Sequence, residues 1–500
     1  MRTASPASPD SLLPQIPPRR CIPLRGWASA GPFCAIVSGM SRPLLSRREI
    51  LGGLAAMPAR AAAPAKGSRY NVLFLMSDEH SPHAAGFLGS RMVKTPALDA
   101  LARSGTAFGA AYCQNPICVP SRASFVTGRM ASNVGVFGND GSLDPKVTTM
   151  ADVFNEAGYK TAWFGKTHWG GNPRFQTGSG KNTQEAARRR GGKELEIGRL
   201  PEEATVAPWP VSAEVDTITK EEAVDFLKQN RNRPFFAGVS FVKPHFPFIV
   251  QEQYYRMYKD IADVPRVTQK MLDDLPLVSK QEREKYGFAK LTSEQIRKAR
   301  AVYFGMVSYI DDLAGEILKT VDQLGLRNNT IILYTADHGE LAGEHGLWYK
   351  NSFYEAAVRV PFVWSFPPAI PRGKMIHAPV MNMDIFPTLC ELCGLTKPEG
   401  LEGRSLLPLM TGAEDGGSRY ALSENYRNRS ASRMIRTPQW KYCYFDQDRE
   451  QLFDMRADRE EENNLAGRPE HRELMASLRA RALEGWRRQG QEARPKKKKY

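Results

Sequence analysis

The residues best suited to chemistry in this 500-residue chain follow short apolar segments. Six acidic, basic or imidazole side chains each come one to four residues after a predicted strand: Asp78, Lys166, His168, His245, Asp337 and His338. In an open α/β sheet, ligands bind in the crevice outside the carboxyl ends of the strands. We therefore expect these distant residues to meet at one site.

The residue types in this set suit metal-assisted attack on an anionic ester. The carboxylates of Asp78, Glu79 and Asp337 are hard oxygen ligands of the kind that calcium and magnesium prefer. Fixed positive charge and proton transfer are predicted for five further side chains: Arg122, Lys166, Lys350, His168 and His245. The segment after Pro120 is predicted to begin a short helix ending at Gly128, whose N-terminus favours an anion. Read singly, each residue would be an ordinary loop or surface group, so the interpretation depends on their meeting.

One segment carries a specific motif. Residues 118–129 read Cys-Val-Pro-Ser-Arg-Ala-Ser-Phe-Val-Thr-Gly-Arg. This segment resembles Cys-x-Pro-Ser-Arg-x-x-x-x-Thr-Gly-Arg, the signature of the formylglycine-dependent sulfatases of the alkaline-phosphatase-like superfamily. The resemblance covers most of residues 70–460, and further matching segments follow in the family's order: 165–168, 243–245, 335–340, 346–350, 354–361 and 384–388.

The resemblance implies a nucleophile and a cofactor. Cys118 would be oxidised by a formylglycine-generating enzyme, and the hydrated aldehyde would attack sulfur. Calcium or magnesium would be held by Asp78, Asp337, His338 and the formylglycine oxygen at position 118. Many members have two adjacent aspartates where this chain has Asp78-Glu79, so Glu79 is expected to bind the ion, reach it through water or miss it.

The resemblance also implies roles for the remaining polar residues. The catalytic set would be Cys118, Arg122, Lys166, His168, His245 and Lys350. Within this set His168 would take the proton of the attacking hydrate, and His245, with Lys350 nearby, would protonate the leaving oxygen.

Two other functions fit the same residues. Sulfate and phosphate transition states have similar geometry, so a phosphodiester or phosphonate monoester hydrolase is the first alternative. A non-catalytic protein that binds sulfated polysaccharide, with Cys118 unconverted, is the second. The natural alcohol or sugar is not indicated. Residues 170–213 and 246–290 are expected to wall its pocket, and four aromatic residues there are candidates for stacking on a ring or for the core: Trp209, Phe248, Tyr254 and Tyr255.

Strands and helices alternate through the middle of the chain. Predicted strands cover residues 70–76, 161–164, 235–241 and 331–335, and predicted helices cover residues 95–105, 149–157, 219–229 and 293–324. This pattern predicts an α/β fold, with a mostly parallel central sheet sandwiched by helices. From residue 411 the pattern changes to paired strands at 431–437 and 440–445 and a helix at 470–486, which predicts a smaller C-terminal α+β subdomain.

The predicted domain organisation has four parts. These are a leader at residues 1–66, a catalytic domain at 67–410, a small subdomain at 411–493 and a Lys-rich tail at 494–500. Residues 170–213, rich in Gly, Arg, Pro and Asn, are expected to form a long surface excursion.

The leader resembles a twin-arginine export signal. Arg47-Arg48 precede the short apolar segment 50–57 and the Ala-rich segment 59–65. Translation from Met40 would give a leader of normal length. Export machinery of this type is thus an expected partner, and the expected location is periplasmic or extracellular. A disordered basic N-terminus is the alternative.

Charge and cysteine usage exclude several classes. The net charge is +15, but residues 1–66 hold nine basic and two acidic residues, and four lysines follow at 496–499. The body is therefore nearly balanced, and nucleic-acid binding is not predicted. The chain contains no run of 18 or more apolar residues, so no membrane-spanning helix is predicted. The Cys390-x-x-Cys393 pair lacks a second pair at zinc spacing, so helix packing is the preferred interpretation.

Overall fold

The computed structural model describes residues 69–171, 174–179, 182–191, 200–427 and 430–486. The predicted leader and the Lys-rich tail lie outside these residues. The described residues from 69 onward form the body of the chain, which begins with the first strand of the sheet.

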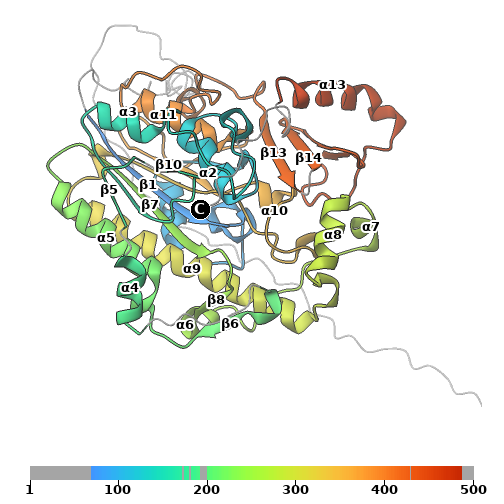
Figure 1. Ribbon diagram of the computed structural model, residues 1–500, viewed down its shortest axis with the longest axis horizontal. Coiled ribbons are helices and arrows are strands. Elements are labelled where there is room, and N and C mark those ends of the chain that lie inside the picture. The colour runs from blue at the N-terminus through green and yellow to red at the C-terminus, as the bar shows by residue number, and fades with distance from the viewer. Residues whose placement is uncertain (1–68, 172–173, 180–181, 192–199, 428–429, 487–500) are drawn as a thin grey trace, which may run out of the picture. The chain divides into compact units, whose positions relative to one another are not determined.

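An eight-stranded sheet forms the centre of the body (Figure 1). Its strand order is β11 (Lys374–Ile376), β2 (Thr106–Phe108), β10 (Phe362–Ser365), β9 (Thr330–Ala336), β1 (Asn71–Asp78), β7 (Phe235–Pro244), β4 (Lys160–Gly165) and β5 (Thr177–Gly178). The five strands from β9 to β5 are parallel, and only β10 runs antiparallel to its neighbours. The prediction of a mostly parallel sheet is confirmed.

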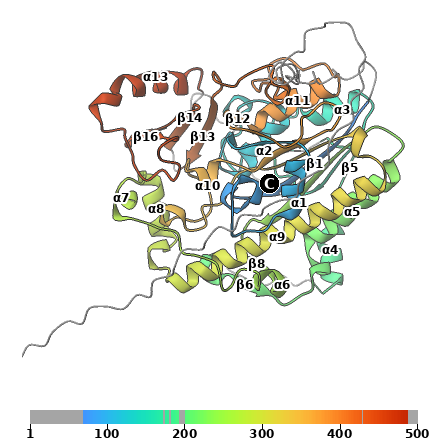
Figure 2. The same ribbon diagram turned by 180° about the vertical axis from the view of Figure 1, so that it is seen from behind.

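Helices cover both faces of this sheet (Figures 1 and 2). One face carries α1 (Pro96–Arg103), α5 (Val215–Asn230) and α9 (Ser293–Gln323), and the other carries α2 (Cys118–Thr127), α3 (Met150–Glu156) and α11 (Ile385–Leu392). The side chains of β1 alternate between the two cores, as the pleat requires. Phe74 packs toward α2 and α3, whereas Leu75 packs toward α5 and α9. A buried β1 explains its continuous apolar sequence.

Helix α9 fixes a neighbouring helix end through a buried carboxylate. Thr292 caps α9 by accepting a hydrogen bond from the backbone N–H of Gln295. Further along α9, the carboxylate of Asp311 accepts hydrogen bonds from the backbone N–H groups of Ala97 and Leu98, at 2.9 and 2.8 Å. These N–H groups lie in the first turn of α1, where no backbone carbonyl can accept them.

Replacing Asp311 with alanine should therefore destabilise the fold. The substitution leaves two backbone donors without an acceptor, and we expect a loss of about 2–3 kcal/mol in the free energy of unfolding. Chemical denaturation measures it. Glu316→Ala on the same helix is the control, because its ion pair with Lys220 is exposed and is worth ~1 kcal/mol at most. Equal losses in the two variants would contradict the capping role.

The C-terminal part forms a second sheet with a core of its own. Four antiparallel strands, β13 (Ala421–Arg427), β14 (Ser430–Arg436), β15 (Trp440–Phe445) and β16 (Gln451–Asp454), pack against α13 (Arg472–Leu483). The sequence predicted β14, β15 and the helix but missed β13 and β16. Glu424 on β13 joins this sheet to the body, because its buried carboxylate accepts hydrogen bonds from the backbone N–H and the hydroxyl of Ser132, at 2.8 and 2.9 Å.

The surface excursion expected at 170–213 contains regular structure. Its described residues form β5 at the edge of the central sheet, α4 (Asn182–Arg189) and β6 (Thr205–Ala207), which pairs with β8 (Ile249–Gln251). The remaining short elements are β3 (Ala111–Tyr112), α6 (Glu252–Tyr255), α7 (Gln269–Asp273), α8 (Leu277–Lys285), α10 (Glu355–Val358), β12 (Val380–Met381) and α12 (Leu407–Thr411).

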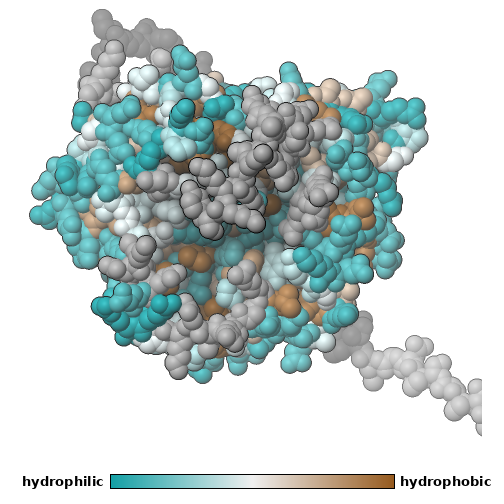
Figure 3. All heavy atoms as spheres, viewed as in Figure 1, coloured by the Kyte–Doolittle hydropathy of each residue, from teal (hydrophilic) through white to brown (hydrophobic). Residues whose placement is uncertain are grey.

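The surface and the cysteines carry few special features. On the face shown in Figure 3, hydrophobic residues form small patches among hydrophilic ones. Among the described residues, no helix is both long enough and apolar enough to cross a membrane. Cys390, within α11, and Cys393, at its C-terminal cap, are free thiols buried in the core, in agreement with the helix-packing interpretation.

Candidate active site

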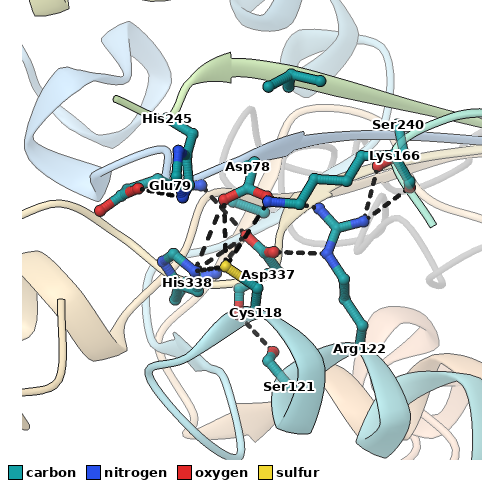
Figure 4. Close-up of polar contacts among 12 residues, drawn as sticks. Asp78, Glu79, Cys118, Ser121, Arg122, Lys166, Ser240, His245, Asp337 and His338 are labelled. Carbon is teal, nitrogen blue, oxygen red and sulfur yellow. Dashed lines mark hydrogen bonds and ion pairs between the residues drawn. The ribbon is translucent and has the colours of Figure 1, made fainter. Parts of the chain in front are cut away.

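The carboxyl ends of four parallel strands meet at one place (Figure 4). Asp78 ends β1, Lys166 follows β4, His245 follows β7, and Asp337 and His338 follow β9. The register of the sheet brings these ends level, since Ser77 on β1 pairs with Ala336 on β9. The expected gathering of residues from distant parts of the chain is thus present in the fold.

Cys118 lies at the centre of this group. Its Sγ is 3.2 Å from His338 Nε2, 3.5 Å from Lys350 Nζ, 3.7 Å from Lys166 Nζ and 3.8 Å from an oxygen of Asp78. Helix α2 begins at Cys118 itself, three residues before the predicted start after Pro120, and is ended by Gly128, which adopts a left-handed conformation with φ 67°. Residue 118 therefore lies at the N-terminal end of this helix, where the helix dipole favours a negative charge.

The charges around Cys118 favour an anion. Burial alone raises the pKa of the thiol, but Lys350, His338 and Lys166 together outweigh that effect and hold the pKa well below its usual value. A negative charge at position 118 is therefore stabilised by a buried electropositive pocket.

Four residues form a group that could hold a metal ion. The ligand atoms of Asp78, Cys118, Asp337 and His338 all lie within 4.8 Å of one another, and all four residues are buried. Burial lowers the pKa of His338, but the carboxylate of Asp337 raises it, and the net value is about 9. Two buried carboxylates thus attract positive charge to this point. Hard oxygen donors and one imidazole fit a divalent cation.

The Arg122 guanidinium forms ion pairs with the carboxylates of both Asp78 and Asp337. The Arg122 side chain is fully buried, with Nε 2.7 Å from an oxygen of Asp337 and Nη2 3.2 Å from an oxygen of Asp78. Nη1 donates to Ser240 Oγ at 3.0 Å and to the carbonyl of Lys166 at 2.9 Å. The sequence suggested that Arg122 faces the ester oxygens. Most of its donors instead hold the carboxylates and the β4 loop in place. Lys166 Nζ, by contrast, forms an ion pair with Asp78 and also reaches Cys118.

The Glu79 carboxylate lies between the side chains of Lys350 and His245. Its Oε2 is 2.8 Å from Lys350 Nζ and 3.4 Å from His245 Nε2. Its backbone has φ 67° and is fixed at both polar groups: the N–H donates to Asp337 at 3.2 Å, and the carbonyl accepts from the Tyr303 hydroxyl at 2.8 Å. Burial raises the pKa of Glu79 to about 8 against the opposing effect of Lys350.

His168 approaches position 118 from the solvent side. It is exposed, has φ 48°, and forms a hydrogen bond with the Cys118 sulfur. All of the sequence-predicted catalytic and metal residues therefore lie in one group. Three other histidines of these loops, His80, His83 and His345, do not join it directly. His80, for example, contacts the Tyr334 hydroxyl at 2.7 Å, and His345 stacks on Tyr354.

Two polar residues of the site were not predicted. Asn139 Oδ1 accepts the backbone N–H of Val119 at 3.0 Å and so caps the helix that carries Cys118. Glu340 accepts the backbone N–H groups of Ala342 and Tyr349, at 2.8 and 2.6 Å, and fixes the loop before Lys350. Glu340 could have been predicted, because it lies in segment 335–340, one of the segments that resemble the family. Asn139 lies in a Gly-Asn-Asp turn outside those segments.

A cavity of about 370 Å³ opens beside Lys350. Aromatic side chains and two amides line it, including Asn139, Phe246, Tyr286, Tyr349, Asn351 and Tyr426. None of the four aromatic residues suggested by the sequence lines this cavity. Phe248 and Tyr254 are buried in the core, and Tyr255 packs against it. Trp209 donates its indole N–H to Glu214. All four residues fall within the ranges 170–213 and 246–290 that were expected to wall the substrate pocket, but their side chains do not line the cavity.

Comparison with known proteins identifies the class. Residues 70–395 match the Sulfatase family, and residues 343–489 match the family described as N-sulphoglucosamine sulphohydrolase, C-terminal. The chain belongs to the sulfatase family and is a sulfuric ester hydrolase. The resemblance carried by residues 118–129 is confirmed.

Individual relatives span most of the chain. Choline-sulfatase of Rhizobium meliloti (strain 1021) is 30% identical over 80% of this chain and 83% of its own length. Arylsulfatase K of Bos taurus is 30% identical over 82% of this chain and 80% of its own length. The crystal structure of a phosphonate monoester hydrolase of Agrobacterium radiobacter superposes with a TM-score of 0.74 at 26% identity, covering 83% of this chain and 96% of the other.

Proposed function

We propose that the chain hydrolyses a sulfate monoester with residue 118 as the nucleophile, after its conversion to formylglycine, and with calcium or magnesium held beside it. The observation that carries this proposal is the position of Cys118 Sγ, within 3.8 Å of His338, Lys350, Lys166 and Asp78. A lone cysteine in a core has no such partners. The surroundings suit an oxygen nucleophile that must develop negative charge.

Asp78, Asp337 and His338 are the proposed metal ligands, with the oxygen that residue 118 carries after conversion. A divalent cation at this point supplies charge neutralisation for the anionic ester and lowers the pKa of a bound hydroxyl. Glu79 is outside the four-residue group. It forms a second possible ligand group with Asp78 and His245, but its Oε2 is already in contact with Lys350 and His245. We assign Glu79 to holding this pair rather than to binding the ion directly.

The remaining side chains act either on the attacking group at position 118 or on the leaving oxygen. His168 contacts position 118 and accepts the proton of the attacking hydroxyl. Lys166 and Lys350 hold fixed positive charge beside position 118, where the ester oxygens gain charge in the transition state. His245, oriented by Glu79, protonates the leaving oxygen. Its Nδ1 lies 2.5 Å from the Phe246 carbonyl, which leaves Nε2 to carry the transferable proton.

Mass spectrometry of the native protein tests the conversion. The tryptic peptide of residues 104–122 contains both Cys113 and Cys118. After alkylation, the converted peptide should carry one alkyl group and should show the loss of one sulfur and two hydrogens with the gain of one oxygen at position 118. A formylglycine-generating enzyme in the host is required. Two alkylated thiols in active protein would refute the nucleophile assignment. Two alkylated thiols in inactive protein from the native host would favour a non-catalytic binder of sulfated polysaccharide.

A second substrate class is supported by one observation. The phosphonate monoester hydrolase structure aligns over 83% of this chain, and the same charged site suits a phosphonate or a phosphodiester. The ratio of kcat/KM for an aryl sulfate to that for an aryl phosphonate decides between them. A ratio below one would move the main activity to phosphonate esters.

The cavity beside Lys350 is the proposed binding place of the alcohol. Tyr286 lines it without contacting a proposed catalytic group, and its ring centroid lies 5.9 Å from that of Tyr349. Replacing Tyr286 with alanine should raise KM for an aryl sulfate roughly tenfold, because about 1.4 kcal/mol of ring packing is lost, and should leave kcat nearly unchanged. Trp209→Ala, outside the cavity, is the control. A fall confined to kcat would contradict a binding role.

Export through the twin-arginine route remains a prediction from Arg47-Arg48. We propose that the mature protein acts in the periplasm or outside the cell, after conversion of Cys118 and folding in the cytoplasm. N-terminal sequencing of the secreted chain would locate the cleavage. An N-terminus at Met1 or Met40 in the exported fraction would contradict a cleaved leader.

A further inference from the structure

A second, larger cavity lies away from the proposed active site. It has a volume of about 1240 Å³ and is enclosed by the loop after β1, the β3 and β11 strands, the segment after α12, the end of β14 and the turn after β16. None of the proposed catalytic or metal residues lines it. We call this space the arginine cavity, after the four arginines in its lining: Arg359, Arg436, Arg456 and Arg459.

The charges of the arginine cavity do not cancel. Its lining also includes Lys374 and four acidic residues: Glu355, Glu414, Asp415 and Glu460. Two of these acids are already neutralised. Glu355 contacts Lys441 at 3.0 Å and Arg359 at 2.8 Å, and Glu414 contacts Arg419 at 2.7 Å. The remaining acids, Asp415 and Glu460, are exposed, and they face an excess of cations.

Arg436 is the strongest candidate for contacting a ligand in this cavity. It is only 8% exposed, and its guanidinium lies 6.0 Å from the centroid of the Tyr112 ring. One nitrogen donates to the Thr437 carbonyl, and the side chain also interacts with Tyr112 and with the Glu355 carboxylate, but the buried Nε has no hydrogen-bond partner among the described residues. A buried guanidinium donor left without an acceptor is costly, and an anionic oxygen would satisfy it.

A second guanidinium lies close to the first. Arg359 Nε contacts Glu355, and the Tyr112 hydroxyl donates to the same carboxylate at 3.1 Å. Arg359 and Arg436 thus flank one tyrosine–glutamate pair. Lys374 adds an ammonium held by the carbonyls of Leu409 and Met410, at 2.8 and 3.0 Å. Three cations are therefore fixed in the wall by the protein itself and need no ligand to order them.

We propose that the arginine cavity is a second binding site for sulfate groups, with Arg436 as its main contact. The volume of about 1240 Å³ far exceeds that of a single ion. The choice of a saccharide segment that carries sulfate as the occupant rests on the proposed function, in which the substrate is a sulfate ester. Arg456 and Arg459, exposed at the cavity, would meet the next anionic groups along it. The site would hold a polymeric substrate or product by a part that is not being cleaved.

Binding measured on full-length Cys118→Ala protein, which cannot turn over the ligand, tests this proposal. Calorimetric titrations would use inorganic sulfate, a sulfated oligosaccharide and its desulfated form. We expect the sulfated oligosaccharide to bind, and Arg436→Ala to weaken it roughly tenfold or more. Arg456→Ala, an exposed change that does not threaten folding, should weaken it severalfold. Arg256→Ala, on a distant exposed helix, is the matched control.

The outcomes separate this site from the active site. In otherwise unmodified enzyme, Arg436→Ala should leave kcat/KM for a small aryl sulfate unchanged. Unchanged oligosaccharide affinity in both arginine variants would overturn the proposal. So would equal binding of the desulfated form. Binding of inorganic sulfate alone, lost in Arg436→Ala, would restrict the site to free sulfate and overturn the saccharide assignment.

Discussion

Replacing Cys118 with alanine should lower kcat/KM for an aryl sulfate by roughly 10⁴-fold or more, as loss of a catalytic nucleophile generally does. Cys118 Sγ lies 3.2 Å from His338 Nε2 and 3.5 and 3.7 Å from the Nζ atoms of Lys350 and Lys166, so the substitution removes the proposed attacking group from the centre of these charges. Steady-state hydrolysis by matured enzyme measures the effect. The fold should persist, because the new side chain is smaller and apolar.

Cys113 is the matched control for this substitution. It lies five residues earlier, is fully buried and is also a free thiol. Burial, reinforced by Asp337, raises the pKa of Cys113 well above its usual value, whereas the cations around Cys118 lower that of Cys118. Cys113→Ala should therefore retain most of the activity. Activity of Cys118→Ala within tenfold of the unmodified enzyme would mean that another group attacks the ester.

The gathering of the site was predictable because strand ends obey a simple rule. Asp78, Lys166, His245 and Asp337 each follow an apolar segment, and parallel strands place their carboxyl ends at one edge. The sequence pattern identified four such strands, and the structure joins all four through three parallel pairings, β9 with β1, β1 with β7 and β7 with β4. The short strands β2, β5, β10 and β11 had too few residues to show an alternating pattern, so the parts of the sheet outside the four central strands were not predicted.

Side-chain direction could not be read from the sequence. Arg122 and Lys166 both carry a positive charge near position 118, yet only the three-dimensional packing makes Arg122 a support for two carboxylates. The wall of the alcohol cavity shows the same limit. Phe246 and Tyr286 fall within the expected range 246–290, but Phe248 and Tyr254 in that range turn into the core. The boundary at residues 410–411 between catalytic domain and subdomain stays a prediction.

The ion pairs of Arg122 explain how the buried site can contain two carboxylates, those of Asp78 and Asp337. Asp78, Asp337 and Arg122 are all fully buried, and burial of a lone carboxylate raises its pKa. Burial does act on Asp78 in this direction, but Lys166, His245 and Arg122 together hold its pKa well below the usual value. The Asp78 carboxylate is thus ionised at neutral pH, before any ion arrives.

Replacing Arg122 with leucine should consequently destabilise the protein by about 3–5 kcal/mol, the typical cost of leaving a buried partner charge uncompensated. The Asp78 and Asp337 carboxylates would lose ion pairs at 3.2 and 2.7 Å, and the Ser240 hydroxyl and the Lys166 carbonyl would lose a donor. The midpoint of chemical denaturation, measured in chelator, should fall. Arg122→Lys should recover part of the loss, because it restores the charge without the planar fork.

Calcium titration of the same variants separates support of the metal site from general packing. If Arg122 orders the two carboxylates, Arg122→Lys should bind calcium more weakly than the unmodified protein even where its fold is retained, and calcium should then stabilise it less. Arg327→Leu, which removes a partly exposed ion pair with Asp322, should change unfolding by ~1 kcal/mol or less and leave calcium affinity unaltered. Equal calcium affinity in Arg122→Lys and unmodified protein would reduce Arg122 to a packing role and leave the preorganisation of the carboxylates to Lys166.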